Sequence, residues 1–102
     1  MALTSQDKEN LKKELAITLS EEPEVIKVVV FGSFLSASDP HDLDVAVFQN
    51  SDQAYLPLAM KYRKKTRMIS RRIPLDIFPL KPGPAGNFML NEIARGEVIY
   101  ER

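Results

Sequence analysis

The sequence predicts an α/β (α+β) fold in which helices pack on a mixed sheet of three to four strands. Along the chain, the spacing of apolar residues changes from the three-to-four-residue period of a helix to the continuous or alternating pattern of a strand. These segments follow one another in the order α-β-β-α-β-α-β, which is typical of layered folds. A chain of 102 residues is long enough for one such unit, so we expect residues 1–102 to form a single domain.

The first predicted helix covers residues 4–20, and the first strand covers residues 25–31. Thr4 or Ser5 can cap the helix, and Pro23 marks its end because proline disfavours a helical conformation of the preceding residue. The strand segment is apolar apart from one lysine and rich in β-branched side chains, which predicts burial. The apolar stripe of the helix consists of Leu11, Leu15 and Leu19.

The second predicted strand covers residues 42–48 and follows a turn containing Asp39 and Pro40. Its side chains alternate between the two faces of the sheet, so one face should be buried and the other exposed. We expect Leu43, Val45 and Val47 on the buried face, and Asp42, Asp44 and Ala46 on the other.

A helix is predicted over residues 54–72 and a third strand over residues 73–80. Pro57 suits the first turn of the helix. In the strand, Asp76 faces opposite to Leu75 and Ile77. The apolar stripe of this helix consists of Leu58, Tyr62 and Ile69.

The C-terminal part is expected to add a loop over residues 81–86, a short helix over residues 87–95 and a last strand over residues 98–100. Asn87 can cap the helix, and Gly96 suits its C-terminal end.

The composition excludes several classes of protein. An apolar fraction of 44% and a charged fraction of 27% argue against disorder. The lack of cysteine excludes a disulfide scaffold, a cysteine nucleophile and a thiolate metal site, and a single histidine makes a zinc site improbable. No apolar run approaches ~18 residues, and the N-terminus lacks the pattern of a secretory signal. We therefore expect a cytoplasmic protein that does not interact with membranes.

The net charge of zero conceals an asymmetry between the two halves of the chain. Residues 1–52 carry 10 acidic and 4 basic side chains, whereas residues 53–102 carry 4 acidic and 10 basic ones. Seven of the 14 basic residues lie within residues 61–72. The neutral total argues against dedicated nucleic-acid binding, although the basic segment could contact phosphate locally.

Gly32 and Ser33 end the first predicted strand. Glycine lets the backbone turn sharply and lie close to a ligand. Exposed amides there, together with the Ser33 hydroxyl, would form an anion-binding nest for phosphate oxygens. Because ordinary turns often contain the same two residues, this pair indicates a site only in combination with the acidic residues that follow.

Asp42 and Asp44 lie on one face of the second predicted strand, ~6.6 Å apart along the backbone. Two carboxylates this close repel each other unless a cation lies between them. Mg²⁺ fits because it is a hard cation that binds carboxylate and phosphate oxygens. The alternative is a solvent-exposed strand face, but aspartate is unfavourable within strands, which favours the metal interpretation.

Asp76 is the lone acidic residue of the third predicted strand. A buried and unpaired carboxylate would be costly or would take up a proton. Asp76 therefore either pairs with Arg71 or Arg72, or it is a third metal ligand on a neighbouring strand.

Together these residues resemble the minimal nucleotidyltransferases of the DNA polymerase β superfamily. The family pattern is an apolar strand ending in Gly-Ser, then Asp-apolar-Asp-apolar, then a later strand with a third carboxylate. The matching segments are residues 28–34, 42–47, 75–77 and 93–101. The resemblance covers residues 11–100 and implies that residues 1–102 are one minimal nucleotidyltransferase domain.

The resemblance implies a Mg²⁺-dependent enzyme that uses ATP or another nucleoside triphosphate. Asp42, Asp44 and Asp76 would be the catalytic residues and would hold two Mg²⁺ ions. Asp76 would also help to activate the attacking hydroxyl. Gly32 and Ser33 would hold the triphosphate.

The spacer between Ser33 and Asp42 is eight residues long, which is short for the family, and it lacks the arginine or lysine that often follows Gly-Ser in these enzymes. We expect one of Lys61, Lys64 and Lys65, on the following helix, to supply the phosphate-binding charge. The alternative is that this basic run is only a solvent-exposed helix surface.

Two functions follow from the resemblance. In the first, the protein transfers a nucleoside monophosphate, with AMP from ATP as the expected case, to a protein or a small acceptor. By this resemblance it would be an antitoxin of the type VII kind in a toxin-antitoxin system, which adenylylates a HEPN-type helical toxin. In the second, a catalytically weak or inactive domain of the same fold neutralises its partner by contact alone, and the short spacer favours this alternative.

Overall fold

The computed structural model of the protein describes residues 3–82 and 90–102 and shows helices packed on a four-stranded sheet. The strand order is β3-β2-β1-β4, with β1 antiparallel to both β2 and β4, and β2 parallel to β3. The predicted mixed sheet is thus confirmed. The elements are α1 (Ser5–Ser20), β1 (Val25–Phe31), α2 (Ser33–Ser36), β2 (Leu43–Gln49), α3 (Tyr55–Lys65), α4 (Arg67–Ser70), β3 (Leu75–Leu80), α5 (Leu90–Ala94) and β4 (Glu97–Glu101).

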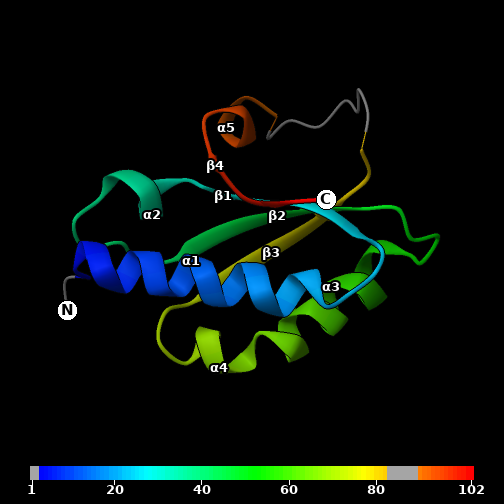
Figure 1. Cartoon of the computed structure of the whole chain (residues 1–102), viewed down its shortest axis with the longest axis horizontal. Coiled ribbons are helices and arrows are strands. Elements are labelled where there is room, and N and C mark those ends of the chain that lie inside the picture. The colour runs from blue at the N-terminus through cyan, green and yellow to red at the C-terminus, as the bar shows by residue number, and fades with distance from the viewer. Residues whose placement is uncertain (1–2, 83–89) are drawn as a thin grey trace.

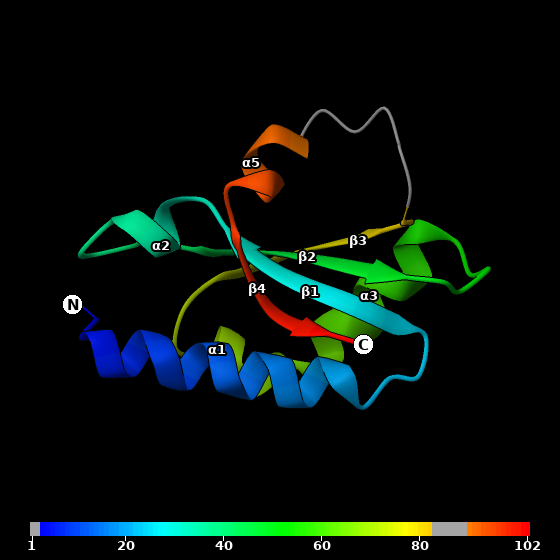
Figure 2. The ribbon, with the colours of Figure 1, turned by 45° about the horizontal axis from the view of Figure 1, so that its top comes forward.

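The helices cover the two faces of the sheet unequally. Helices α1, α3 and α4 lie together on one face, α5 lies on the other, and α2 lies at the end of the sheet where β1 ends (Figures 1 and 2). The main core is formed between the sheet and the three-helix face, and it includes the two predicted helical stripes, all of whose members are buried. A second, smaller core lies under α5 and consists of Val29, Phe31, Ala46 and Ile93.

The second core corrects the expectation for β2. Leu43, Val45 and Val47 face the main core as predicted. Ala46, which was expected on a polar face, is fully buried under α5 because Ile93 packs over that part of the sheet. On this face of β2, Asp44 at the N-terminal end and Phe48 at the C-terminal end are both half-buried, on either side of the buried Ala46.

The prediction of one continuous helix over residues 54–72 is wrong. It is divided into α3 and α4 at Thr66, whose backbone leaves the helical region at φ −102° and ψ 19°. The buried Thr66 hydroxyl donates a hydrogen bond to the Tyr62 carbonyl at 2.8 Å, which satisfies the polar group inside the core.

Other boundaries differ by small amounts. The short helix α2 was not predicted, because a single helical turn leaves no periodic pattern in the sequence. β2 and β3 begin later than expected, at Leu43 and Leu75, and β4 is longer by one residue at each end. The expected cap at Asn87 lies outside the described residues. None of the helices in the two described ranges combines the length and the apolar character needed to cross a membrane.

A cluster of charged and polar groups connects α3 to the turn between α1 and β1. The hydroxyl of the buried Tyr62 donates a hydrogen bond to Glu24 at 2.8 Å, and the Lys61 ammonium lies 2.8 Å from the same carboxylate. Burial would raise the pKa of Glu24, but the hydrogen bonds from Lys61 and Tyr62 lower it overall. Lys65 pairs with Glu21 at 2.9 Å. These contacts fix α3 at the end of the sheet where β1 begins.

Gly96 allows the connection from α5 to β4 to lie directly against β1. A Cβ atom at this position would lie 2.5 Å from the Val30 carbonyl oxygen and 2.8 Å from a Val29 methyl carbon, both of which are too close. The Gly96 amide donates to the Ile93 carbonyl at 2.9 Å and ends the helix. Gly96 therefore sets the position of α5 relative to the sheet.

We predict that Gly96→Ala destabilises the protein by roughly 1–3 kcal/mol, because the backbone of β1 cannot move aside without breaking its strand pairing. Chemical denaturation of the variant and of the parent measures this difference in the free energy of unfolding. Asn91→Ala, at an exposed position of α5, is the matched control and should be close to neutral. Equal stability of the Gly96→Ala variant and the parent would contradict the packing described for this turn.

Candidate active site

Strand register brings three carboxylates together at one end of the sheet. In the parallel pair of β2 and β3, Asp44 lies opposite Asp76. Asp42 directly precedes β2 and, two residues from Asp44, lies on the same face. One carboxylate oxygen from each of Asp42, Asp44 and Asp76 lies within 4.8 Å of the other two. The expected proximity of the three aspartates is therefore found.

The environments of the three carboxylates differ. Asp42 and Asp44 are half-buried and Asp76 is exposed, so the site opens to solvent on the β3 side. The alternative pairing of Asp76 with Arg71 or Arg72 is absent from the described residues, because Arg72 pairs with Glu14 and Arg71 contacts the Met68 sulfur.

The electrostatics of the cluster disfavour the charged form of Asp44. Burial raises the pKa of Asp44 to about 6, with further contributions from the negative charges of Asp42, Asp76 and Glu92 and from a hydrogen bond to Asp76. Like charges at this spacing cannot all ionise without a counter-ion. A divalent cation that binds carboxylate oxygens would relieve this repulsion, so the donor set fits Mg²⁺.

Gly32 lies directly against the cluster. Phe31 pairs with Asp44 across the antiparallel strands, and the chain turns immediately afterwards, with Gly32 at φ 84°. A Cβ atom at Gly32 would lie 2.6 Å from Asp44 Oδ2. Both the positive φ and the close approach require glycine. The sharp turn predicted at Gly32 is present, and the contact of its backbone with a phosphate stays a prediction.

A cleft of about 560 Å³ opens beside Asp44, between α2 and α5. Gly32 and Ser33 line it from the end of β1 and the start of α2, and Glu92 and Arg95 line it from α5. Asp44 connects the cleft to the carboxylate cluster. The full lining is Gly32, Ser33, Leu35, Ser36, Asp44, Glu92 and Arg95.

The three lysines expected at the site are not brought to it. Lys61 and Lys65 pair with Glu24 and Glu21 near the start of β1, whereas the aspartates lie where β1 ends. Lys64 lies on the outer face of α3, beside a surface pocket that includes none of the aspartates. The ion pairs and the break at Thr66 hold this part of α3 away from the cleft. The solvent-exposed alternative therefore describes Lys64, and the other two contribute to the packing of α3.

The sequence patterns did not identify the two charged residues that α5 and the position after it contribute to the cleft. Glu92 lies on α5, Arg95 directly follows the end of that helix, and both line the cleft. The signal was present in the sequence, because the buried Ile93 between them fixes which side of α5 faces the sheet. This pattern does not identify a site unless it is also known that α5 packs over the end of β1.

Comparison with known proteins agrees with this geometry. The family described as polymerase beta, nucleotidyltransferase, matches residues 13–102. The crystal structure of a candidate nucleotidyltransferase from Sulfolobus solfataricus superimposes with a TM-score of 0.54, covering 91% of this chain and 79% of that chain at 21% sequence identity. This likeness supports the fold. None of the curated proteins matches the sequence.

The fold, the paired Asp42 and Asp44 and the match over most of the chain define a nucleotidyltransferase-type domain. The protein belongs to the polymerase β nucleotidyltransferase family.

We predict that Asp44→Asn stabilises the metal-free protein at neutral pH. The raised pKa means that the folded parent retains a proton which the unfolded chain releases, so its stability falls as the pH rises from about 4 to about 6. The variant has no ionisable group at this position, so its stability does not fall for this reason as the pH rises. Solvent screening limits the gain to on the order of 1 kcal/mol, or a few degrees in Tm.

Thermal unfolding of both proteins at pH 4 and at pH 7, without divalent cations, measures the effect. The matched control is Asp52→Asn, at an exposed aspartate outside the cluster, which should follow the parent at both pH values. A Tm difference between Asp44→Asn and the parent that is the same at pH 4 and pH 7 would contradict the raised pKa of Asp44.

Proposed function

We propose that the protein is a Mg²⁺-dependent nucleotidyltransferase that transfers AMP from ATP to a hydroxyl group of a partner protein. The single observation that carries this proposal is the convergence of Asp42, Asp44 and Asp76 beside the Gly32 turn, in a chain of the polymerase β nucleotidyltransferase family. We take residues 1–102 to act as one minimal nucleotidyltransferase domain in the cytoplasm, where ATP and Mg²⁺ are both available.

The three aspartates would bind two Mg²⁺ ions. Their oxygens are close enough to share cations, and the charge repulsion on Asp44 is the kind that a bound cation relieves. When bound, Mg²⁺ would orient the reacting oxygens and stabilise the negative charge of the pyrophosphate leaving group.

The reaction needs no nucleophile from this chain. The oxygen of the acceptor hydroxyl forms a bond to the α-phosphorus of ATP, and the bond from that phosphorus to the bridging oxygen of the β-phosphate breaks. Pyrophosphate leaves with the electron pair. Asp76, the most exposed of the three carboxylates, accepts the hydroxyl proton or passes it to solvent.

Gly32 and Ser33 would hold the phosphate chain of the nucleotide. Both line the cleft next to Asp44, and the lack of a side chain at Gly32 allows a phosphate to lie close to the backbone. Ser33 is exposed and lines the cleft, and its hydroxyl would donate a hydrogen bond to a phosphate oxygen.

The partner that we propose is a HEPN-type helical toxin, and this chain would be its antitoxin. The proposal rests on the resemblance to minimal nucleotidyltransferases of this size. The site supports a large acceptor, because Asp76 is exposed and the carboxylate cluster opens to solvent, so the hydroxyl of a folded protein is able to reach it.

A contact-only antitoxin is the second candidate. The observation that favours it is the short spacer of eight residues between Ser33 and Asp42. The only helix in this region, α2, is a single short turn that borders the cleft. In that case the fold would present a binding surface, and the aspartates would be unnecessary for neutralising the partner.

We expect the parent to move label from [α-³²P]ATP, but not from [γ-³²P]ATP, onto the product of an adjacent reading frame when Mg²⁺ is present. Asp76→Asn should lower the rate at least 100-fold, because it removes a carboxylate that acts on the reacting oxygen. The matched control is again Asp52→Asn, which should transfer label at the rate of the parent. Gel autoradiography with purified proteins measures the transfer.

The same experiment separates the two candidates. One outcome would contradict the enzymatic function and support the contact-only antitoxin. In that outcome neither protein transfers label, and Asp76→Asn neutralises the partner as completely as the parent does. A rise in the Tm of the parent with ATP and Mg²⁺ would show nucleotide binding independently of the acceptor.

A further inference from the structure

The cleft between α2 and α5 has one cationic side chain among the described residues that line it, Arg95. The nucleotide proposed above carries several negative charges, and the carboxylates at one end of the cleft would add to the repulsion. A phosphate chain lying over Gly32 and Ser33 therefore needs a positive group on the opposite wall. Arg95 is on that wall, at the end of α5.

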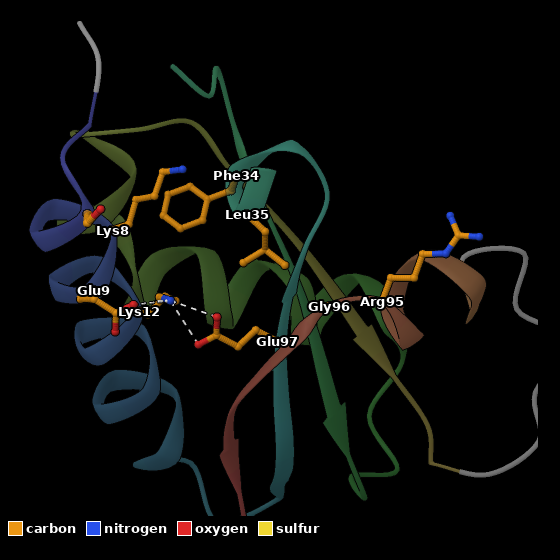
Figure 3. Close-up of a pocket in the computed structure, with 9 residues that line it drawn as sticks. Lys8, Glu9, Lys12, Phe34, Leu35, Arg95, Gly96 and Glu97 are labelled. Carbon is orange, nitrogen blue, oxygen red and sulfur yellow. Dashed lines mark hydrogen bonds and ion pairs between the residues drawn. The ribbon is translucent and has the colours of Figure 1, made fainter. Parts of the chain in front are cut away.

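The Arg95 side chain is available to a ligand. It is exposed, and within the described part of the chain it makes no ion pair or hydrogen bond, although Glu92 lies on the same side of α5. Figure 3 shows Arg95 at the end of α5, with its guanidinium directed away from the ion pair between Lys12 and Glu97. An arginine without a partner retains all its donors for phosphate oxygens.

The other cations near α2 are already engaged. The Lys8 ammonium donates a hydrogen bond to the Ala37 carbonyl at 2.6 Å and lies over the Phe34 ring, so both of its contacts are with α2 and the residue that follows it. Lys12 pairs with Glu9 at 2.6 Å and with Glu97 at 3.0 Å. Both lysines line the neighbouring pocket beside α1, which Arg95 also borders (Figure 3). Neither lysine lines the cleft that contains Asp44.

The backbone that carries Arg95 is held on both sides. Ile93 is buried in the second core, and Gly96 lies against the backbone of β1, where no larger residue fits. Arg95 lies between these two anchors, and β1 leads directly to Gly32. Both walls of the cleft are thereby attached to the same strand, β1.

We propose that Arg95 binds the β- and γ-phosphates of the nucleotide and supplies the positive charge that the spacer after Ser33 lacks. The inference rests on the proposed function and extends it from the metal site to the α2–α5 cleft. The planar guanidinium is able to donate two parallel hydrogen bonds to one phosphate, a geometry that lysine cannot reproduce.

The test is the affinity for ATP, ADP and AMP in the presence of Mg²⁺, measured by isothermal titration calorimetry. Arg95→Ala should weaken ATP binding about tenfold or more, as expected for the loss of a charge-assisted hydrogen bond. AMP lacks the β- and γ-phosphates, so its affinity should change less than threefold. Arg95→Lys should recover part of the loss, because it restores the charge but not the paired donors.

The matched control is Arg63→Ala, which removes an exposed arginine of α3 that lies outside the cleft and should bind ATP like the parent. The Tm of each metal-free variant verifies that folding is unchanged. ATP binding by Arg95→Ala equal to that of the parent, or an equal loss for ATP and AMP, would overturn the assignment of Arg95 while leaving the proposed function intact. A parent that binds no ATP would overturn both.

Discussion

The pairing register of β2 with β3 is the constraint on which the site depends. It places Asp44 opposite Asp76, although 32 residues and two helices separate them in the chain. A shift of the register by one residue would turn every side chain of one strand to the other face and would separate the carboxylates. The main core prevents such a shift, because Leu43, Val45 and Val47 of β2 and Ile77 of β3 are buried against the helices. Hydrophobic burial thus holds together a charge cluster that would otherwise move apart.

The remaining parts of the site are attached to β1, the central partner of β2. Gly32 follows the end of β1 and lies against Asp44, and Gly96 fixes the start of β4 on the same strand. Two glycines therefore determine where α2 and α5 stand on either side of the cleft. The site combines a repulsive acidic end with one arginine at the opposite wall, which is the charge arrangement required by a ligand that contains both cations and phosphates.

Much of this was predictable from local sequence patterns, and the failures have physical causes. The β-branched run of residues 25–31 predicted β1, and the alternation of residues 42–48 predicted β2. Helical stripes predicted α1 and α3, and the unfavourable position of Asp44 within a strand indicated a functional residue. The break at Thr66 was missed because the apolar stripe continues across it, with Tyr62 buried before the break and Ile69 buried after it. Lys61 was expected at the phosphate site, but it pairs with two glutamates that lie 37 and 39 residues earlier in the chain. Local sequence patterns do not reveal such distant partners. Arg95 was missed because its importance depends on α5 packing over the end of β1.

The central claim is that Asp42, Asp44 and Asp76 share divalent cations beside a bound nucleotide. The most direct measurement is a crystal structure of the parent protein with Mn²⁺ and a non-hydrolysable ATP analogue, in which anomalous scattering locates the metal independently of the model of the protein. We expect an anomalous peak among the three carboxylates, with the phosphate chain extending from it into the cleft between α2 and α5. A nucleotide bound elsewhere, or a site with no metal among these aspartates at saturating Mn²⁺, would contradict it.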